Sequence, residues 1–462
     1  MGIFLPSVSG PGPPEPPPTG LALMHRKKKD IETTKKQTCA MLAIEIYSMA
    51  YGLPCNSGSP LSAWLQQLKD NGGEFAAMLS ASDGGSGEGY HHTIREICQQ
   101  PVTWAGTARH LKESRSLVAE SLASCQRIVL TGSGSSRCAG ECAAPALERD
   151  LGRTVEVAGA GELLLKRRAS VAGEATLVVS LARSGESPES AAVVEMLLET
   201  EPRTNHLIIT CNSEGKLAKA FAGQSRVRVI DLGPQVNDRS LVMTSSFTNL
   251  VLGARFLGWV EKAAEFVGMV DQLDWAGRQF LAKWPDRLNE WGSGDIRRIV
   301  YLGSGSRLGA CRESALKALE MTGGRVASMA QTYLGLRHGP LCFIDEWTLV
   351  ICYLSSDPLI RNYERDLIME LNTKGLGARK LIAGTGDPGA GLCRGRDLAI
   401  PYEVPEDTAD DNLAVLDAVI GQILGFRRSL EAGLQPDCPS VNDVISRVVG
   451  DFCIHGAVGA AK

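Results

Sequence analysis

RIVLTGSGS, residues 127–135, recurs as RIVYLGSGS, residues 298–306, with seven of nine positions identical. Both segments are apolar, β-branched runs that end in glycine and serine, which is typical of a buried strand followed by a tight turn. A repeat of about 171 residues is far longer than the unit of a solenoid. It therefore indicates a duplicated domain.

The repeat continues downstream at nearly the same offset. ATLVVSLARSGES (175–187) corresponds to WTLVICYLSS (347–356), and HLIITCNS (206–213) corresponds to KLIAGTGD (380–387). Stretches of helical composition separate these strands in both halves. Alternating strands and helices predict an α/β fold with two doubly wound parallel sheets, each flanked by helices.

The chain of 462 residues is long enough for two domains of ordinary size. Residues 5–20 are dominated by Pro, Gly and Ser and predict disorder, whereas the basic run at 25–37 predicts a solvated helix start or, alternatively, a nucleic-acid arm. We predict five segments: a disordered, basic extension (1–58), an N-terminal helical arm (59–110), a first domain (111–262), a helical connector (263–291) and a second domain with the C-terminal tail (292–462).

The composition excludes several classes of partner. A net charge of −4 argues against nucleic acid or an anionic membrane as the main partner, and no apolar run approaches the length of a membrane span. Thirteen cysteines without a CxxC pair are typical of a reducing cytoplasm. Cys138 and Cys142 have no further ligand nearby, so no metal site is predicted.

Two glycine- and serine-rich turns are candidates for binding phosphate. GSGSS (132–136) and LARSGES (181–187) each follow a predicted strand and open into a helix, where free N–H groups and the helix dipole favour an anion. Neither matches the Walker A or GxGxxG pattern, and one such turn alone can be merely a tight connection. Two of them at adjacent strand ends of one parallel sheet favour a ligand site.

The second half contributes charged residues. Glu313, Lys317 and Glu320 have i, i+4 and i+7 spacing on a predicted helix, so they share one face, either as part of a site or as an ordinary solvated ion pair. His338 precedes Gly-Pro on a rigid turn and is a candidate general acid or base.

These motifs, together with SLARSGESPES (180–190), ESALKALE (313–320) and GLRHGP (335–340), resemble the tandem sugar-isomerase (SIS) domains of sugar-phosphate isomerases. HTIREICQQPVTW (92–104) is similar to the segment that precedes the isomerase half of glucosamine-6-phosphate synthase. The glutaminase domain of that synthase has no counterpart here.

Within the superfamily, the resemblance is greatest to the AgaS type. NDRSLVMTSSFTN (237–249), YLSSDP (353–358), GLQPDCPS (433–440) and RVV (447–449) carry it. That type comprises galactosamine-6-phosphate deaminase/isomerases, also described as tagatose-6-phosphate ketose/aldose isomerases.

The resemblance implies roles for individual residues. Ser136, Ser184 and Ser187 would bind phosphate, with Ser135 and Arg183 beside them. Glu320 would move a proton between C1 and C2 of the open-chain sugar, and His338, supplied by a neighbouring subunit, would open the ring. Glu313 and Lys317 match the accompanying helix positions. The synthase uses a lysine near its C-terminus, where this tail offers only Lys462.

The resulting hypothesis is a cytoplasmic homodimer or higher homo-oligomer that needs no cofactor and no metal. It converts an amino sugar 6-phosphate, foremost galactosamine 6-phosphate, to tagatose 6-phosphate and ammonia. One alternative is a plain ketose/aldose isomerase of tagatose 6-phosphate. Another is a non-catalytic SIS protein that senses a sugar phosphate.

Overall fold

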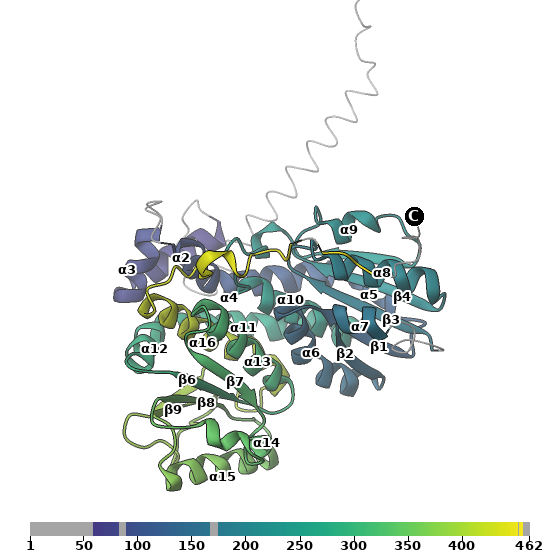
Figure 1. Ribbon diagram of the computed structural model, residues 1–462. Helices are drawn as coiled ribbons and strands as arrows, with labels where there is room; N and C mark the ends of the chain where they lie inside the picture. Colours follow the sequence, from purple (N-terminus) through teal and green to yellow (C-terminus); the bar gives the residue numbers. More distant parts are fainter. Residues whose placement is uncertain (1–58, 83–88, 167–173, 451, 456–462) are drawn as a thin grey trace, which may run out of the picture. The chain divides into compact units, whose positions relative to one another are not determined.

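A computed structural model describes residues 59–82, 89–166, 174–450 and 452–455 of the chain (Figure 1). The predicted disordered extension, 1–58, lies outside these residues. By their contacts residues 64–462 form one compact unit, to which the following description applies. No helix among the described residues is long and apolar enough to cross a membrane.

Helices precede the first sheet. They are α2 (Pro60–Asp70), α3 (Glu74–Ala81), α4 (His91–Glu113) and α5 (Arg115–Leu122). The long helix α4 packs against α10 and α11 and buries Trp104 completely. Its hydrophobic face therefore joins the arm firmly to the first lobe.

The first lobe contains a five-stranded parallel sheet in the order β2-β1-β3-β4-β5. Its strands are β1 (Arg127–Gly132), β2 (Thr154–Gly159), β3 (Thr176–Ala182), β4 (Thr204–Thr210) and β5 (Val227–Asp231). Strand β3 is buried at every position, as a central parallel strand should be. The helices of this lobe are α6 (Ser135–Leu151), α7 (Ala160–Lys166), α8 (Pro188–Thr200), α9 (Lys216–Ala220) and α10 (Ser245–Arg255), with the short 3-10 turns η3 (Pro234–Val236) and η4 (Phe256–Lys262).

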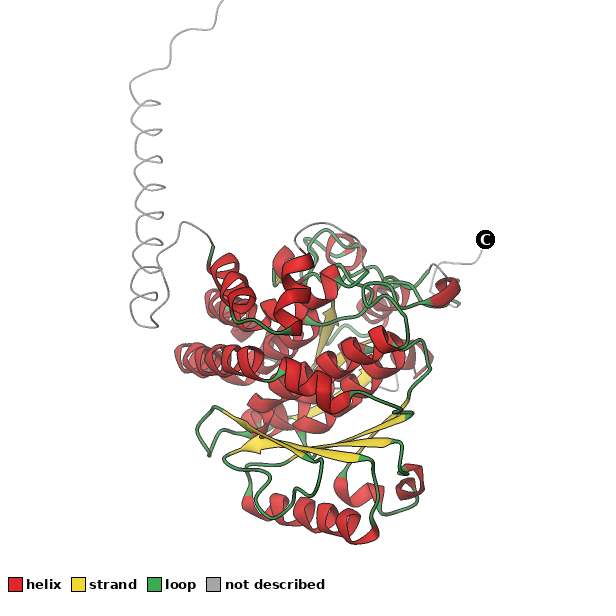
Figure 2. Cartoon of the chain, turned by 90° about the vertical axis from the view of Figure 1, so that its left-hand side faces the viewer, coloured by secondary structure: helices red, strands yellow, loops and turns green. Residues whose placement is uncertain are grey.

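Two helices, α11 (Ala263–Lys283) and α12 (Pro285–Gly292), lead to the second lobe. Its sheet has the order β10-β9-β8-β6-β7, which is the topology of the first sheet read from the other edge. Figure 2 shows this sheet with helices on both faces. The strands are β6 (Arg298–Leu302), β7 (Ala327–Gln331), β8 (Thr348–Tyr353), β9 (Arg379–Thr385) and β10 (Leu398–Tyr402). The helices are α13 (Ser306–Met321), α14 (Tyr333–Leu336), α15 (Pro358–Lys374) and α16 (Asp410–Glu431). Two short 3-10 turns, η5 (Pro340–Phe343) and η6 (Val441–Asp443), complete this half of the chain.

The duplication extends to the details of both lobes. Gly134 and Gly305, at the same point of the repeated turn, both have φ of +55°, a left-handed conformation that favours glycine. The serine before each glycine donates a hydrogen bond to a glutamate, from Ser133 to Glu189 and from Ser304 to Glu364. The predicted fold of two doubly wound parallel sheets is confirmed.

Helix α13 links the two lobes. It belongs to the second lobe but packs against α6 of the first lobe as well as α16 (Figure 1). A Cβ atom on Gly309 would lie 2.5 Å from the backbone nitrogen of Cys142, and one on Gly421 would lie 2.1 Å from the hydroxyl of Ser314. These glycines allow a very close approach of the helix backbones, so α13 is tightly fixed relative to the first lobe.

Candidate active site

A cleft opens at the switch point of the first sheet. In a sheet of order 2-1-3-4-5 the connections diverge between β1 and β3, where ligands typically bind. The turn after β1 leads into α6 and the turn after β3 leads into α8, with Gly185 at φ of +67° in the second turn. The cleft has a volume of about 400 Å³ and is lined by serines from both turns: Ser135, Ser136, Ser184 and Ser187.

Helix α13 brings charge to this cleft from the second lobe. The Lys317 Nζ lies 3.1 Å from the Ser135 hydroxyl and 3.4 Å from a carboxylate oxygen of Glu313, and it also donates a hydrogen bond to Glu320. Lys317 and Glu313 are buried, whereas the Glu320 side chain is 25% exposed and lines the cleft. The predicted helix face therefore meets the predicted serine turn. It is not an ordinary solvated pair.

The buried environment shifts the pKa values of Glu313 and Lys317. Desolvation raises the pKa of Glu313 to about 7, although the nearby Lys317 opposes the shift. Burial also acts to lower the pKa of Lys317, but the two carboxylates outweigh it and raise that pKa above its ordinary value. Lys317 consequently stays charged at neutral pH and places an ammonium group beside the serine turns.

Arg183 has an additional structural role that the sequence did not suggest. Its guanidinium donates hydrogen bonds to the backbone carbonyls of Ser240, 3.3 Å away, and Leu241, 2.8 Å away, and to the carbonyl of Arg447. It thereby joins the end of β3 to the 237–243 loop and to the C-terminal tail. A direct contact of Arg183 with phosphate stays a prediction.

The C-terminal tail forms one wall of the cleft, a contact that the sequence pattern does not predict. Residues 444–450 are among those that line the cleft. Arg447 anchors them: its Nε lies 2.9 Å from the Asp238 carbonyl oxygen, and its Nη2 lies 2.8 Å from the Asn237 side-chain oxygen. RVV (447–449) is part of the family pattern, but a motif alone cannot show that the tail returns to a loop about 210 residues earlier.

Two buried carboxylates hold the 237–243 loop from the other side. Asp238 accepts hydrogen bonds from the N–H groups of Thr244 and Ser246, 2.7 and 2.8 Å away, at the start of α10. Glu96, from the QP-containing helix α4, accepts from the N–H groups of Arg239 and Ser240. Burial and the neighbouring charge of Asp238 raise the pKa of Glu96 to about 8.

We expect Glu96 to make the protein less stable as pH rises. The unfolded carboxyl ionises near its ordinary pKa, whereas the folded one keeps its proton until about pH 8, so between these values the folded state binds the extra proton. The wild type should lose this stability as the pH rises, whereas Glu96→Gln has no such group to titrate. The difference in unfolding free energy, variant minus wild type, should therefore increase by up to about 4 kcal/mol from pH 5 to pH 8. Urea unfolding of both proteins at several pH values measures this difference. A constant difference across that range would contradict the raised pKa.

His338 lies apart from this cleft within the chain. It is exposed on the turn after α14, where its backbone N–H donates to the Gly335 carbonyl. It is not among the described residues that line the cleft. The structure thus brings together every predicted site residue except His338. Its delivery by a neighbouring subunit stays a prediction.

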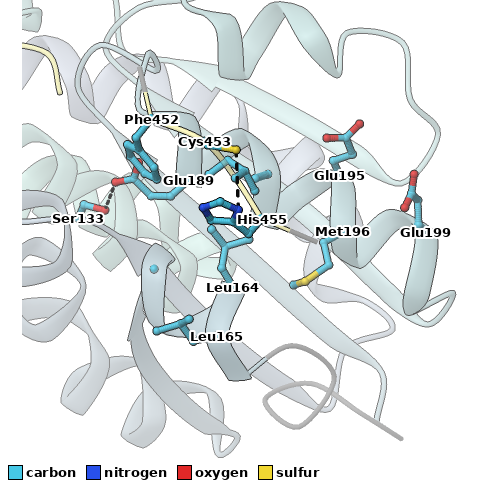
Figure 3. Close-up of a pocket in the computed structure, with 13 residues that line it drawn as sticks. Ser133, Leu164, Leu165, Glu189, Glu195, Met196, Glu199, Phe452, Cys453 and His455 are labelled. Carbon is cyan, nitrogen blue, oxygen red and sulfur yellow. Dashed lines mark hydrogen bonds between the residues drawn. The ribbon is translucent and has the colours of Figure 1, made fainter. Parts of the chain in front are cut away.

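A second, larger pocket of about 890 Å³ adjoins the cleft and shares Ser133 with it (Figure 3). Its walls come from α7, α8 and tail residues 452–455, and it is lined by apolar side chains such as Met196 and Phe452 and by the carboxylates of Glu189, Glu195 and Glu199. Neither lysine nor arginine is among its described lining residues. Size alone therefore does not identify a phosphate site, since the smaller cleft has the serine hydroxyls and the Lys317 ammonium that suit an anion.

The duplicated doubly wound lobes and the serine turns at the switch point define a protein built from two sugar-isomerase lobes. A family model described as the SIS domain matches residues 121–248. The AgaS protein of Streptomyces coelicolor is 36% identical over 79% of this chain and 95% of its own length. The D-galactosamine-6-phosphate deaminase AgaS of Escherichia coli is 31% identical over the same shares.

A solved structure agrees with these relatives. A candidate tagatose-6-phosphate ketose/aldose isomerase from Clostridium novyi superposes with a TM-score of 0.76 at 29% identity, covering 82% of this chain and 97% of that one. The chain belongs to the AgaS family of SIS-domain proteins. The resemblance predicted from the motifs is confirmed, as is the prediction of an enzyme of the sugar-phosphate deaminase/isomerase class.

Proposed function

We propose that the chain is a deaminating isomerase that converts an amino sugar 6-phosphate, foremost galactosamine 6-phosphate, to tagatose 6-phosphate and ammonia. One observation carries the proposal: Lys317 and Glu320 of the second lobe meet the serine turns of the first lobe in one cleft. An anion-binding turn and an acid–base group in one small cleft suit a sugar phosphate that is held by its phosphate and transformed at its other end.

The phosphate end is recognised by the first lobe. Ser136, Ser184 and Ser187 provide hydroxyl donors, and the first turns of α6 and α8 provide backbone N–H groups at the positive ends of helix dipoles. The ammonium of Lys317, 3.1 Å from the Ser135 hydroxyl, adds positive charge. Hydrogen bonds of this kind to a dianion are charge-assisted and strong.

Glu320 then transfers one proton at the other end of the substrate. As a base it removes the proton on C2 of the open-chain amino aldose while the aldehyde oxygen takes up a proton, which gives an enol. As an acid it then returns the first proton to C1 while the amine nitrogen gives up one of its own. The C2 amine becomes an imine, which water hydrolyses to the ketose while nitrogen leaves as ammonia. Lys317 donates a hydrogen bond to Glu320 and holds its carboxylate in place.

The names of the curated relatives support deamination. Proteins of the matched family from Escherichia coli are named D-galactosamine-6-phosphate deaminase, whereas the Clostridium novyi structure is named for tagatose-6-phosphate isomerisation. A plain isomerase would use the same cleft without losing nitrogen. A sensor would need no proton-transferring carboxylate beside the phosphate turns.

The decisive experiment measures ammonia and ketose phosphate together. Purified protein is incubated with galactosamine 6-phosphate, glucosamine 6-phosphate and tagatose 6-phosphate in separate reactions. Equal amounts of ammonia and ketose phosphate from galactosamine 6-phosphate support the proposal. Interconversion of tagatose 6-phosphate with an aldose, without any ammonia from the amino sugars, would establish the plain isomerase. Binding without turnover would establish the sensor.

The proposal includes a homodimer, in which His338 of one subunit opens the sugar ring in the cleft of the other. His338 is exposed and lies outside the cleft of its own chain, which agrees with this arrangement. It also includes a cytoplasmic location. Every cysteine that the structure describes is a free thiol, in keeping with a reducing compartment.

We expect Arg447→Ala to weaken substrate binding without slowing proton transfer. The substitution removes the hydrogen bonds that fix the tail wall to Asn237 and Asp238, while Glu320 lies on α13 and loses no contact. The KM should rise about tenfold, equivalent to one net hydrogen bond, with kcat nearly unchanged. Steady-state kinetics test this expectation. Val441→Ala, at an exposed position of the tail that does not line the cleft, is the control, and an unchanged KM in Arg447→Ala would refute the anchoring role.

A further inference from the structure

The second lobe contains a copy of the phosphate-binding turns, which the sheet register identifies residue by residue. Arg127 of β1 pairs with Thr176 of β3, and Arg298 of β6 pairs with Thr348 of β8 in the same way. Counting along the strands from these pairs makes Arg307 the counterpart of Ser136. The same count makes Ser356 the counterpart of Ser184. Ser184 lines the open cleft of the first lobe.

Arg307 places a much larger side chain at the position that a serine has in the first lobe. Its side chain is completely buried and donates two hydrogen bonds to the Asp417 carboxylate, at 2.7 and 2.6 Å. It also donates to the Leu354 carbonyl at the end of β8 and lies over the rings of Tyr353 and Tyr402. Arg307 is the second residue of α13, so these bonds hold the first turn of that helix.

A carboxylate occupies the place of an anionic ligand in this copy. Asp410, the first residue of α16, accepts a hydrogen bond from the N–H of Ser356, 2.8 Å away, and another from the hydroxyl of Ser355. The same carboxylate lies 3.8 Å from the Arg307 guanidinium. A backbone amide, a serine hydroxyl and a guanidinium are the partners that a bound phosphate would have.

We propose that the second lobe's turns form an anion site that the chain fills with its own Asp410. Two consequences follow. Each chain binds a single sugar phosphate, in the first lobe, whichever sugar that lobe accepts. The second site instead fixes the first turn of α13, so that Asp410 acts through Arg307 as a positioning residue for Glu320, which the same helix presents to the cleft.

Removal of the internal anion should create a site for an external one. In the background of Ser184→Ala with Ser187→Ala, which disables the first site, adding Asp410→Ala leaves the donors of Ser355 and Ser356 without an acceptor. We expect the Tm to fall by about 3–6 °C and to recover when formate or inorganic phosphate is added. With Asp410→Asn, which keeps an oxygen acceptor, both the fall in Tm and its recovery with added anion should be much smaller. If formate and inorganic phosphate raise the Tm equally with and without Asp410→Ala, the proposal is overturned.

The kinetic readout separates positioning from mere stability. Asp410→Ala alone, in the otherwise native chain, should lower kcat several-fold with little change in KM, and formate should restore kcat, whereas formate should not accelerate the wild type. Formate is preferred here because inorganic phosphate would compete in the first cleft. A kcat of Asp410→Ala that equals the wild-type value, or that formate does not restore, argues against positioning.

The stoichiometry of the wild type tests the same idea without any substitution, should the alanine variants not fold. Calorimetric titration with tagatose 6-phosphate and with inorganic phosphate should give one site per chain. That site should disappear in the Ser184→Ala, Ser187→Ala variant. Two sites per wild-type chain would overturn the self-filled second site, and loss of one of the two in the serine variant would show that both lobes bind phosphate.

Discussion

The KM of the Ser184→Ala, Ser187→Ala double variant is expected to exceed that of the wild type by about 100-fold. Both serines line the cleft at the end of β3, beside the N-terminus of α8, where the helix dipole favours an anion. Each hydrogen bond to a charged phosphate contributes at least ~1.5 kcal/mol, and 1.4 kcal/mol corresponds to a tenfold change in affinity. Initial rates over a range of substrate concentrations, and competition by inorganic phosphate, measure the loss.

The second lobe offers a matched control for this prediction. Ser356→Ala changes the counterpart of Ser184 in the duplicated sheet, but its N–H remains bound to Asp410, so the KM should stay at the wild-type value. A double variant that binds substrate and inorganic phosphate as tightly as the wild type would show that the phosphate is held elsewhere. A large KM increase in Ser356→Ala would show that the two lobes are not functionally distinct.

Much of the fold was readable from the sequence because buried parallel strands have a strong local pattern. The repeat of RIVLTGSGS located β1 and β6, and the apolar runs that follow it located β3, β4, β8 and β9. The strand ends then indicated where the phosphate turns meet, because parallel strands all place their carboxyl ends at one edge of the sheet. Helical spacing similarly placed Glu313, Lys317 and Glu320 on one face.

The parts that could not be predicted depend on contacts between distant segments. The burial of Glu313 follows from the close packing of α13 against α6, which requires glycine at 309. The tail wall depends on Arg447 reaching Asp238, and the bonds of Arg183 depend on the path of the 237–243 loop. No local pattern encodes such contacts. The motif alone suggested that Arg183 faces the ligand, whereas its guanidinium also holds three backbone carbonyls.

The two lobes share one fold but contribute different parts of the cleft. The first keeps small serines at its turns and leaves a cleft open, while the second places Arg307 and Asp410 in the equivalent space and contributes the helix that carries Glu320. A cleft assembled from both copies needs a helix in a fixed position, which explains the close approach of α13 to both α6 and α16. Two predicted site residues do not line this cleft: Glu313 is joined to it through Lys317, and His338 lies apart from it.

Mixed dimers test whether that histidine comes from a second subunit. Glu320→Gln removes the proton-transferring carboxylate and His338→Ala removes the ring-opening group, so each homodimer should lose about 10²- to 10⁴-fold in kcat, the usual contribution of a positioned acid–base group. When the two variants are co-expressed with different tags, heterodimers form and can be purified through both tags. The measurement is the kcat per heterodimer compared with that of the wild-type dimer.

The expected result follows from how the lesions are distributed. If each cleft uses Glu320 of one chain and His338 of the partner subunit, one cleft of the heterodimer collects both lesions and the other collects none. Activity should then return to about half the wild-type value per dimer. If both groups acted within one chain, each cleft would contain one lesion and the heterodimer would stay as inactive as its parents. An inactive mixture with proven heterodimers would therefore reject a shared site, whereas recovery of half the activity would make the dimer the smallest functional unit.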